Sequence, residues 1–350
     1  MNRWQHRRMA KRMIGLLLLA LIGSVAGYTF WTAYQFKKMT REWYQTLPGE
    51  PSTREVGESS GPPPLTVRDG ALPSQQPREP AIPLVPPVRQ LKPFTLLLIG
   101  VDSREGERAR SDTLMLAAVH PGRQRVYLLS IPRDSYMELP GRGFDKVNHA
   151  MAYGGPALLK GALERYFAIP IDRYITIDFQ GFRRVVDELG GIQLYVKKRM
   201  KYTDPTDGTQ IDLQPGLHLL NGKQALDYAR YRKSDIGRED TDNERIVRQQ
   251  EILRALARKG ASWQGWWKAS RLLDILGDHI RTNLSEEEIA SLWLSFADAP
   301  QDLLVTDTLN GRDQRIWHNG LRVWYFFADQ GEARRIRQRF AEELQDLPTS

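Results

Sequence analysis

The chain has 350 residues, of which 41% are hydrophobic and 26% charged, an ordinary composition for one large globular domain or two small ones. Its net charge is +8, but five basic residues precede residue 13 and no acid occurs among the first 36 residues, so the remainder carries only 8 − 5 = +3. That balance argues against a nucleic-acid partner, and the absence of cysteine excludes disulfides and thiolate metal sites.

The N-terminus predicts a membrane anchor. Residues 14–33, IGLLLLALIGSVAGYTFWTA, are long and apolar enough to cross a bilayer as one helix of roughly 20 residues. We expect a transmembrane signal-anchor over 14–36 in the cell membrane, with the basic tail 1–13 in the cytoplasm by the positive-inside rule and the rest of the chain outside. The alternative is a cleaved signal peptide, because the small residues at 24–26 resemble a cleavage site.

Residues 37–93 are predicted to form an extracytoplasmic linker. The stretch 48–93 holds 12 of the chain's 21 prolines. Such a composition buries too little apolar surface to fold, and it favours extended polyproline II segments. We therefore expect a semi-rigid spacer between the membrane and the domain that follows.

A single extracytoplasmic domain is predicted over 94–350. Apolar runs indicate strands, and segments with helical spacing alternate irregularly with them. This pattern predicts an α/β fold, a three-layer α/β/α domain with a central mixed β-sheet. The predicted strands are 94–101, 113–119, 126–131, 174–178 and 192–196, and the predicted helices are 156–167, 180–190, 222–229, 243–258, one beginning near Ser285, and 332–345.

Two aspartates stand where predicted strands meet a loop. Asp102 ends the first predicted strand and Asp112 precedes the second, so a loop reaching out and back brings both carboxylates to one edge of the sheet. A pair of carboxylates suits Mg²⁺, or Mn²⁺ in its place, with waters and substrate phosphate as the other ligands. The alternative for each aspartate is a turn or capping residue.

A set of arginines comes from two distant stretches of the chain. Arg230 and Arg232 are two apart at a helix end that runs into an extended segment, where both can face one pyrophosphate. Arg245 and Gln249 are four apart on the next helix and share a face. Planar guanidinium groups suit phosphate oxygens, whereas the alternative for each arginine is a surface salt bridge. The candidates are Arg110, Arg133, Arg230, Arg232, Arg245, Arg248 and Gln249.

Three further polar positions allow two interpretations each. Asp242 directly precedes the predicted helix 243–258, so it is an N-cap, a functional carboxylate, or both. Lys146 and Asn148 either contact the phosphate or make structural hydrogen bonds.

Six segments in order resemble the LytR-CpsA-Psr family of cell-wall glycopolymer ligases: VDSR, RSDT, SIPRD, KVNHAMAYGGP, LNGKQALDYARYR and DNERIVRQQ. The resemblance covers roughly 94–260 and extends to the layout of anchor and spacer. It implies a magnesium-dependent phosphotransferase that moves a glycan-1-phosphate from a polyprenyl pyrophosphate carrier to peptidoglycan.

The resemblance also implies roles for individual residues. Asp102 and Asp112 match the family's metal-linked aspartates, and Asp242 matches a position that activates the acceptor hydroxyl or tunes the arginines. Arg133 and Arg245 belong to the set that stabilises the leaving polyprenyl phosphate.

The chain departs from the family's pattern at Glu244, where the family often has glycine, and in the longer loop before it.

Two other activities use the same residues: hydrolysis of polyprenyl pyrophosphates with water as the acceptor, and non-catalytic binding of a lipid-linked glycan by a regulatory protein. A polyprenyl chain needs a long apolar cavity, whose candidate walls are the apolar faces of 156–167 and 180–190.

Overall fold

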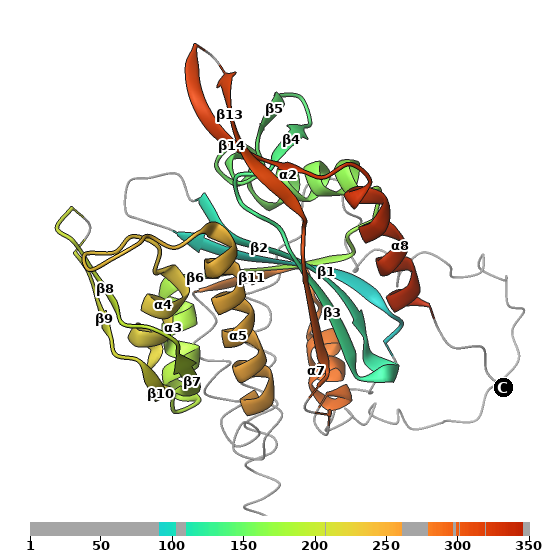
Figure 1. Cartoon of the computed structure of the whole chain (residues 1–350). Coiled ribbons are helices and arrows are strands. Elements are labelled where there is room, and N and C mark those ends of the chain that lie inside the picture. The colour runs from blue at the N-terminus through green and yellow to red at the C-terminus, as the bar shows by residue number, and fades with distance from the viewer. Residues whose placement is uncertain are drawn as a thin grey trace, which may run out of the picture.

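The computed structural model describes residues 91–102, 110–206, 208–260, 279–296, 299–300, 302–318 and 320–345 (Figure 1). In chain order the elements are β1 (Phe94–Asp102), β2 (Arg110–His120), the 3₁₀ helix η1 (Pro121–Arg123), β3 (Arg125–Ser130), β4 (Tyr136–Leu139), β5 (Gly143–Lys146), α2 (His149–Phe167), β6 (Arg173–Asp178), α3 (Phe179–Glu188), β7 (Ile192–Val196), β8 (Met200–Asp204), β9 (Thr209–Leu213), β10 (Gly216–Leu220), α4 (Gly222–Arg230), α5 (Asp242–Gly260), β11 (Ile280–Thr282), α7 (Glu286–Ser295), β12 (Leu304–Thr308), β13 (Gly311–His318), β14 (Leu321–Ala328) and α8 (Glu332–Leu344).

The centre of the domain is a six-stranded mixed sheet in the order β11-β6-β1-β2-β3-β12. β6 is parallel to β1, β12 is parallel to β3, and β2 is antiparallel to both β1 and β3. The strands β1, β3, β6 and β12 therefore all run in one direction, and their carboxyl ends lie at one edge of the sheet. In sheets of this kind ligands bind beyond the carboxyl ends of the strands.

Apolar side chains alternate between the two faces of the sheet. Leu97 and Leu116 face the core that α2 and α8 cover, together with Phe340 of α8. Leu96 and Met115 face the opposite way, where residues of α5 and α7 pack against them. Figure 1 shows α2 and α8 on one side of the sheet and α5 and α7 on the other. The predicted mixed α/β sheet, covered by helices on both faces, is confirmed.

A second core lies beside the sheet. It joins α3, α4 and α5 to the hairpins β7–β10 and β8–β9, and its centre includes Leu194, Ile211, Tyr228 and Ile252. Sequence patterning predicted the helices and β7, but it missed β8, β9 and β10. Each of these strands has only five residues, so its apolar periodicity is short and weak.

Local signals set several helix boundaries as predicted. Gly154 and Gly155 have non-helical dihedral angles, so Pro156 begins a second helical segment within α2. Proline has no backbone N–H, and in the first turn of a helix that group has no intrahelical acceptor to lose. Gly190, with a φ of 78°, follows the end of α3. Ser285 and Glu288 form a reciprocal capping box at the start of α7.

The hairpin β13–β14 was not predicted. It follows β12 directly and projects from the domain beside the smaller hairpin β4–β5 (Figure 1). Tyr136 of β4 packs edge-on against Tyr325 and at a tilt against Phe327, with ring centroids 5.0 Å apart in both pairs. The aromatic cluster fixes the base of the hairpin to the domain.

The predicted anchor, 14–36, and most of the predicted linker, 37–93, lie outside the described residues. Among the helices that the structure describes, none is long and apolar enough to span a membrane. The membrane topology therefore stays a prediction.

Candidate functional site

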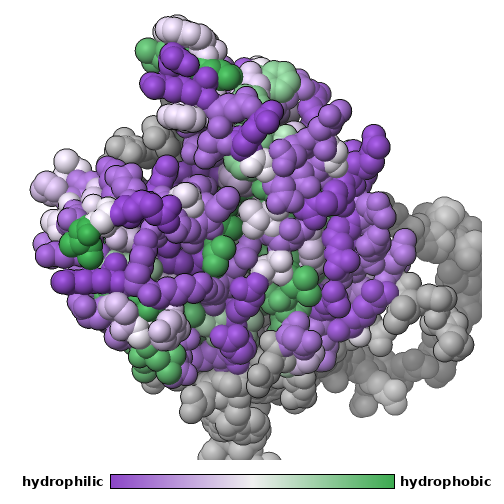
Figure 2. Space-filling view, in the orientation of Figure 1, coloured by the Kyte–Doolittle hydropathy of each residue, from purple (hydrophilic) through white to green (hydrophobic). Residues whose placement is uncertain are grey.

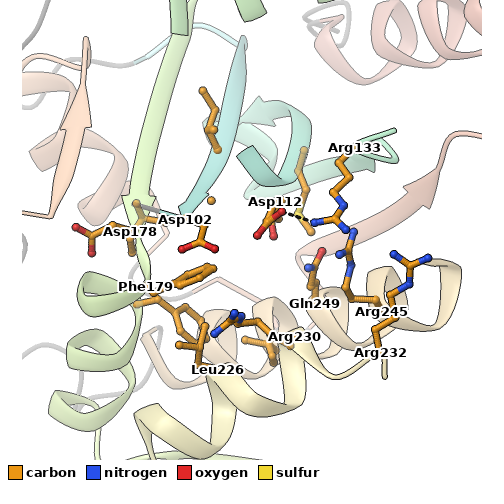
Figure 3. A pocket seen from close by; sticks show the side chains of 18 of the residues that line it. Asp102, Asp112, Arg133, Asp178, Phe179, Leu226, Arg230, Arg232, Arg245 and Gln249 are labelled. Carbon is orange, nitrogen blue, oxygen red and sulfur yellow. Dashed lines mark hydrogen bonds and ion pairs between the residues drawn. The ribbon is translucent and has the colours of Figure 1, made fainter. Parts of the chain in front are cut away.

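A cavity of about 440 Å³ opens at the carboxyl edge of the sheet, and we call it the edge cavity. The ends of β1 and β6, the start of β2, the turn after β3, and helices α3, α4 and α5 all contribute to its wall. Figure 3 shows carboxylates, arginines and apolar side chains converging on it. Its charged lining residues include Asp102, Asp112, Arg133, Asp178, Arg230, Arg232, Lys233 and Arg245.

Asp102 and Asp112 reach the cavity from adjacent strands. Asp102 is the last residue of β1 and lies opposite Arg110, the first residue of β2. The register shifts between Gly100 and Val101, so the ladder skips Asp112, which stands in a β-bulge. A bulge bends its strand and re-aims the side chain. The two carboxylates therefore share the edge cavity, as the loop argument predicts, whereas the side chain of Arg110 is outside the described residues.

Arg133 follows β3 and forms an ion pair with Asp112, which is dashed in Figure 3. Its Nε also lies 4.0 Å from Asp134 Oδ2. Burial disfavours the charged guanidinium, but the carboxylates of Asp112 and Asp134 outweigh this effect and raise the pKa of Arg133. The backbone N–H of Asn148 donates to the carbonyl of Arg133 at 3.2 Å. These contacts keep a charged arginine on the cavity wall.

Arg230 and Arg232 lie on either side of a backbone turn. Arg230 ends α4, and the next residue, Tyr231, leaves helical geometry with φ −54° and ψ 124°. The guanidinium carbon of Arg230 lies 4.7 Å from the centre of the Phe179 ring, which positions it by a cation–π contact. Both arginines line the edge cavity, as their spacing predicted.

Arg245 and Gln249 are one turn apart on α5 and both line the edge cavity. The Arg245 side chain is only 8% exposed and forms an ion pair with Asp242 at 2.6 Å. Within the described part of the chain, its buried Nε–H has no hydrogen-bond acceptor. Burial, and then the charges of Arg133 and Arg232, lower the pKa of Arg245 against the opposing charge of Asp242.

Buried donors without acceptors are rare because each costs free energy, so an orphan donor needs an explanation. In Arg245 this donor stands among arginines that repel one another. An anion bound in the cavity satisfies the donor and relieves the repulsion, because charge-assisted hydrogen bonds to phosphate oxygens suit guanidinium groups. The electrostatics of the cavity therefore favour a multiply charged anion.

Arg248 does not line the cavity, contrary to the sequence-based grouping. It is buried, its Nε donates to the carbonyl of Tyr228 at 2.9 Å, and it also donates to the carbonyl of Tyr231. Its Nη1 lies 2.7 Å from Asp240 Oδ2. Arg248 thus connects α5 to both ends of the segment 228–240, which carries Arg230 and Arg232.

The N-cap of α5 is Thr241, not Asp242. The Thr241 Oγ1 accepts from the N–H of Glu244 at 3.2 Å, and the Glu244 carboxylate accepts from the N–H of Thr241 at 2.7 Å. This capping box explains the glutamate at a position where the LytR-CpsA-Psr pattern often has glycine. Because Thr241 caps the helix, Asp242 is left to pair with Arg245.

Lys146 and Asn148 do not line the edge cavity. The Lys146 Nζ lies 2.8 Å from Asp134 Oδ1 and 5.7 Å from the centre of the Tyr325 ring. Asn148 is 6% exposed and binds the Arg133 carbonyl through its backbone N–H. Of the two interpretations, structural support of the Arg133–Asp134 turn fits their contacts, and direct binding to phosphate in the edge cavity does not.

The edge cavity also has an apolar lining. Phe182 of α3, Leu226 of α4 and Ile252 of α5 contribute to it. Of the two predicted walls for an apolar chain, α3 contributes, but 156–167 does not. The apolar residues of that helix are packed into the main core against the opposite face of the sheet.

Sequence reasoning missed six polar residues of the cavity: Thr113, Asp178, Tyr202, Asp204, Thr209 and Lys233. The Lys233 Nζ lies 5.8 Å from the centre of the Tyr202 ring. Lys233 follows Arg232 directly and extends the basic run RYRK, a signal that was available in the sequence. Tyr202 lies on β8, which was not predicted.

The model of the LytR_cpsA_psr family matches residues 71–342. The polyisoprenyl-teichoic acid–peptidoglycan teichoic acid transferase TagU of Oceanobacillus iheyensis is 34% identical over 261 residues, which cover 72% of this chain and 76% of the relative. TagU of Bacillus subtilis is 30% identical over 74% of this chain and 80% of its own.

Solved structures have the same fold. B. subtilis TagV superposes with a TM-score of 0.63 and 29% identity, over 74% of this chain and all of TagV. TagT bound to LIIa-WTA superposes with a TM-score of 0.59 and 31% identity, over 72% of this chain and 91% of TagT.

We predict that Arg248→Ala destabilises the fold. The substitution removes the charged partner of Asp240, whose side chain has no exposed surface, and leaves the carbonyls of Tyr228 and Tyr231 without this donor. Breaking a buried ion pair typically costs about 3–5 kcal/mol, which urea unfolding measures. Arg258→Ala, which removes an exposed arginine from the same helix, is the control. A loss no larger than that of the control contradicts the structural role of Arg248.

Proposed function

This chain belongs to the LytR-CpsA-Psr family, and we propose that it is a phosphotransferase that moves a glycopolymer from a polyprenyl pyrophosphate carrier to peptidoglycan. Relatives from two genera are named polyisoprenyl-teichoic acid–peptidoglycan teichoic acid transferases. A member of the same fold was solved as TagT bound to LIIa-WTA.

The observation that carries the proposal is the two-part lining of the edge cavity. Arg133, Arg230, Arg232 and Arg245 line it together with apolar side chains such as Phe179 and Leu226. A polyprenyl pyrophosphate has the matching division, with a charged head and a hydrocarbon tail. The guanidinium groups bind the pyrophosphate oxygens, and the apolar lining takes the first isoprene units.

The reaction needs a nucleophile, a base and a stabilised leaving group. A hydroxyl of peptidoglycan attacks the phosphorus nearer the glycan, and the bond from that phosphorus to the bridging oxygen breaks. Asp242, at the start of α5, accepts the hydroxyl proton. The arginines neutralise the charge that develops on the polyprenyl phosphate as it leaves, which is the main contribution of a protein to phosphoryl transfer.

Asp102 and Asp112 fit a magnesium or manganese ion, because Mg²⁺ typically takes one or two carboxylates and completes its shell with waters and phosphate oxygens. Within the described part of the chain no group of three or more histidine, cysteine or acidic side chains is placed to hold a metal, so the remaining ligands of an ion held by Asp102 and Asp112 would be waters and substrate phosphate. A bound divalent cation supplies positive charge opposite the arginines. The ion pair between Arg133 and Asp112 orients this carboxylate whether or not a metal is present.

We place the catalytic domain outside the cytoplasm, anchored by a single span over 14–36. The basic residues before this span and its apolar length support the orientation. Peptidoglycan lies on the same side, where the acceptor is available.

Replacing Arg230 or Arg232 with lysine is expected to lower transfer by about tenfold to a hundredfold. Lysine keeps the charge but loses the second bond of the fork, and one charge-assisted hydrogen bond is worth about 1.5–3 kcal/mol. The measurement is transfer of a polyprenyl-pyrophosphate-linked glycan to peptidoglycan by the full chain, alongside its melting temperature.

The matched control for these variants is Arg238→Lys. Arg238 lies in the same loop, its side chain is 70% exposed, and its ion pair with Glu244 is of the surface kind that contributes little. Transfer by the Arg230 and Arg232 variants at the level of this control means that the two arginines are not phosphate ligands. Glycan release that is equal with and without peptidoglycan identifies a hydrolase instead.

Asp102→Ala and Asp112→Ala are each expected to abolish divalent-cation-dependent transfer. Both variants remove an oxygen ligand from the cavity mouth, so calorimetric titration should also detect weaker Mg²⁺ or Mn²⁺ binding. Asp204→Asn is the control, because Asp204 lines the same cavity from β8. Full transfer by either alanine variant after chelation of divalent cations contradicts the metal assignment.

The topology is tested with a reporter that is active only outside the cytoplasm, fused after Pro93. We expect activity, because the basic residues before the apolar span keep the tail 1–13 inside. A reporter that requires the cytoplasm, fused at the same position, should be inactive. The reverse pattern contradicts both the topology and the proposed function.

A further inference from the structure

The hairpin β13–β14 has two different faces. Side chains directly opposite each other in an antiparallel pair point to the same face, and residues two apart along a strand do so as well. Tyr325 and Phe327 share one face, which packs on Tyr136. The other face, which we call the open face, carries Asp313, Arg315, Trp317, Arg322, Trp324 and Phe326.

The open face presents two exposed indoles among arginines. Trp317 is 71% exposed and Trp324 is 57% exposed. Arg315 lies directly opposite Trp324, and Trp317 lies directly opposite Arg322, so the indoles and guanidinium groups alternate around a square. Two exposed tryptophans on one sheet face are costly to leave in water, and tryptophan and arginine dominate the energetics of protein interfaces. The projecting hairpin is visible at the top of Figure 2.

The base of the open face meets the reaction centre. Phe326 lies beneath a small cavity of about 150 Å³ between the hairpin and the first two turns of α5, where Asn243 and Val247 also line it. Asn243 directly follows Asp242 in the chain. Asp313 lies opposite Phe326, and burial together with the charges of Asp242 and Asp134 raises the pKa of Asp313. The charge of Asp242 acts on Asp313, so the base of the open face lies near the proposed base, and Phe326, which is 6% exposed, anchors it in the main core.

We propose that the open face of β13–β14 binds the acceptor, and that its occupant is a glycan strand of peptidoglycan. The proposal rests on the proposed function. The C–H faces of pyranose rings are apolar and pack flat on indole rings, while the ring hydroxyls remain in water. The hairpin carries three arginines against one aspartate, which matches the carboxylates that peptidoglycan carries.

The position of the hairpin explains how an acceptor hydroxyl reaches Asp242. A saccharide seated on Trp317 and Trp324 continues along the open face toward Asp313 and the small cavity. From Trp317 to Asp313 the strand covers about 13 Å at 3.3 Å per residue, enough for consecutive sugar rings. Leu321 is also exposed at the tip, but on the open face the indoles alternate with arginines and the base lies near Asp242, which favours a charged polysaccharide over a lipid surface.

The test is binding of the full chain, in detergent, to purified peptidoglycan sacculi that carry no glycopolymer. Trp317→Ala/Trp324→Ala is expected to weaken binding about tenfold or more, because truncating central aromatic residues of an interface has effects of this size. Trp317→Phe/Trp324→Phe retains aromatic stacking and should keep most of the affinity. Tyr195→Ala is the matched control, because Tyr195 is 61% exposed on β7, in the other part of the domain.

In transfer assays the alanine pair should raise the KM for peptidoglycan and leave the KM for the lipid-linked donor unchanged.

Unchanged sacculus binding by the alanine pair overturns the inference, and so does an equal loss in Tyr195→Ala, which indicates nonspecific adhesion. If the alanine pair loses binding to phospholipid vesicles but keeps its binding to sacculi, the inference is also overturned and the hairpin is assigned to the membrane. Because sacculus binding needs no donor, tryptophan-dependent binding without transfer refutes the proposed function alone. Transfer with unaltered binding and KM in the alanine pair refutes the acceptor surface alone.

Discussion

The placement of the arginines depends on one buried contact, between Arg248 and the segment 228–240. Its guanidinium binds the carbonyls of Tyr228 and Tyr231 and the carboxylate of Asp240. The carbonyls near the end of a helix lack intrahelical donors, and Arg248 supplies them from α5. Lys198 also pairs with Asp240, so this buried carboxylate is balanced from two elements. The geometry of Arg230 and Arg232 is therefore set by a residue that never reaches the cavity.

Charge balance in the cavity mouth is incomplete without a ligand. Arg133 has Asp112 and Arg245 has Asp242 as partners, but the charges of Arg133 and Arg232 still lower the pKa of Arg245. Folding tolerates this repulsion because the elements that carry the arginines are fixed by separate cores, beneath the sheet and beside it. An anion in the cavity would reduce this repulsion and accept from the orphan donor of Arg245. Such preorganised sites are typical of enzymes that stabilise developing charge.

The sequence predicted the parts of the site that depend on local spacing. Asp102 and Asp112 flank a loop between adjacent strands, and Arg230 and Arg232 flank one backbone turn. Sequence could not separate Arg245 from Arg248, because residues three apart on a helix lie near one face and only the packing of α4 decides between them. It also missed β8 and β9, which are only five residues long, so that tertiary contacts determine them. For the eight-residue strand β14 a signal was available, because the run VWYFF is rich in the β-branched and aromatic residues that indicate a strand.

The two proposed substrate sites lie toward different ends of the sheet. The edge cavity lies at the ends of β6 and β1, and the open face of β13–β14 continues from β12 at the other end of the sheet. Figure 3 shows Arg133 and Arg245 on the side of the edge cavity away from Asp102 and Phe179. Phosphoryl transfer requires the attacking and leaving oxygens to lie roughly in line across the phosphorus. Under the proposed function, a donor in the edge cavity and an acceptor on the hairpin would approach the phosphorus from different ends of the sheet, which is the separation that an in-line displacement needs.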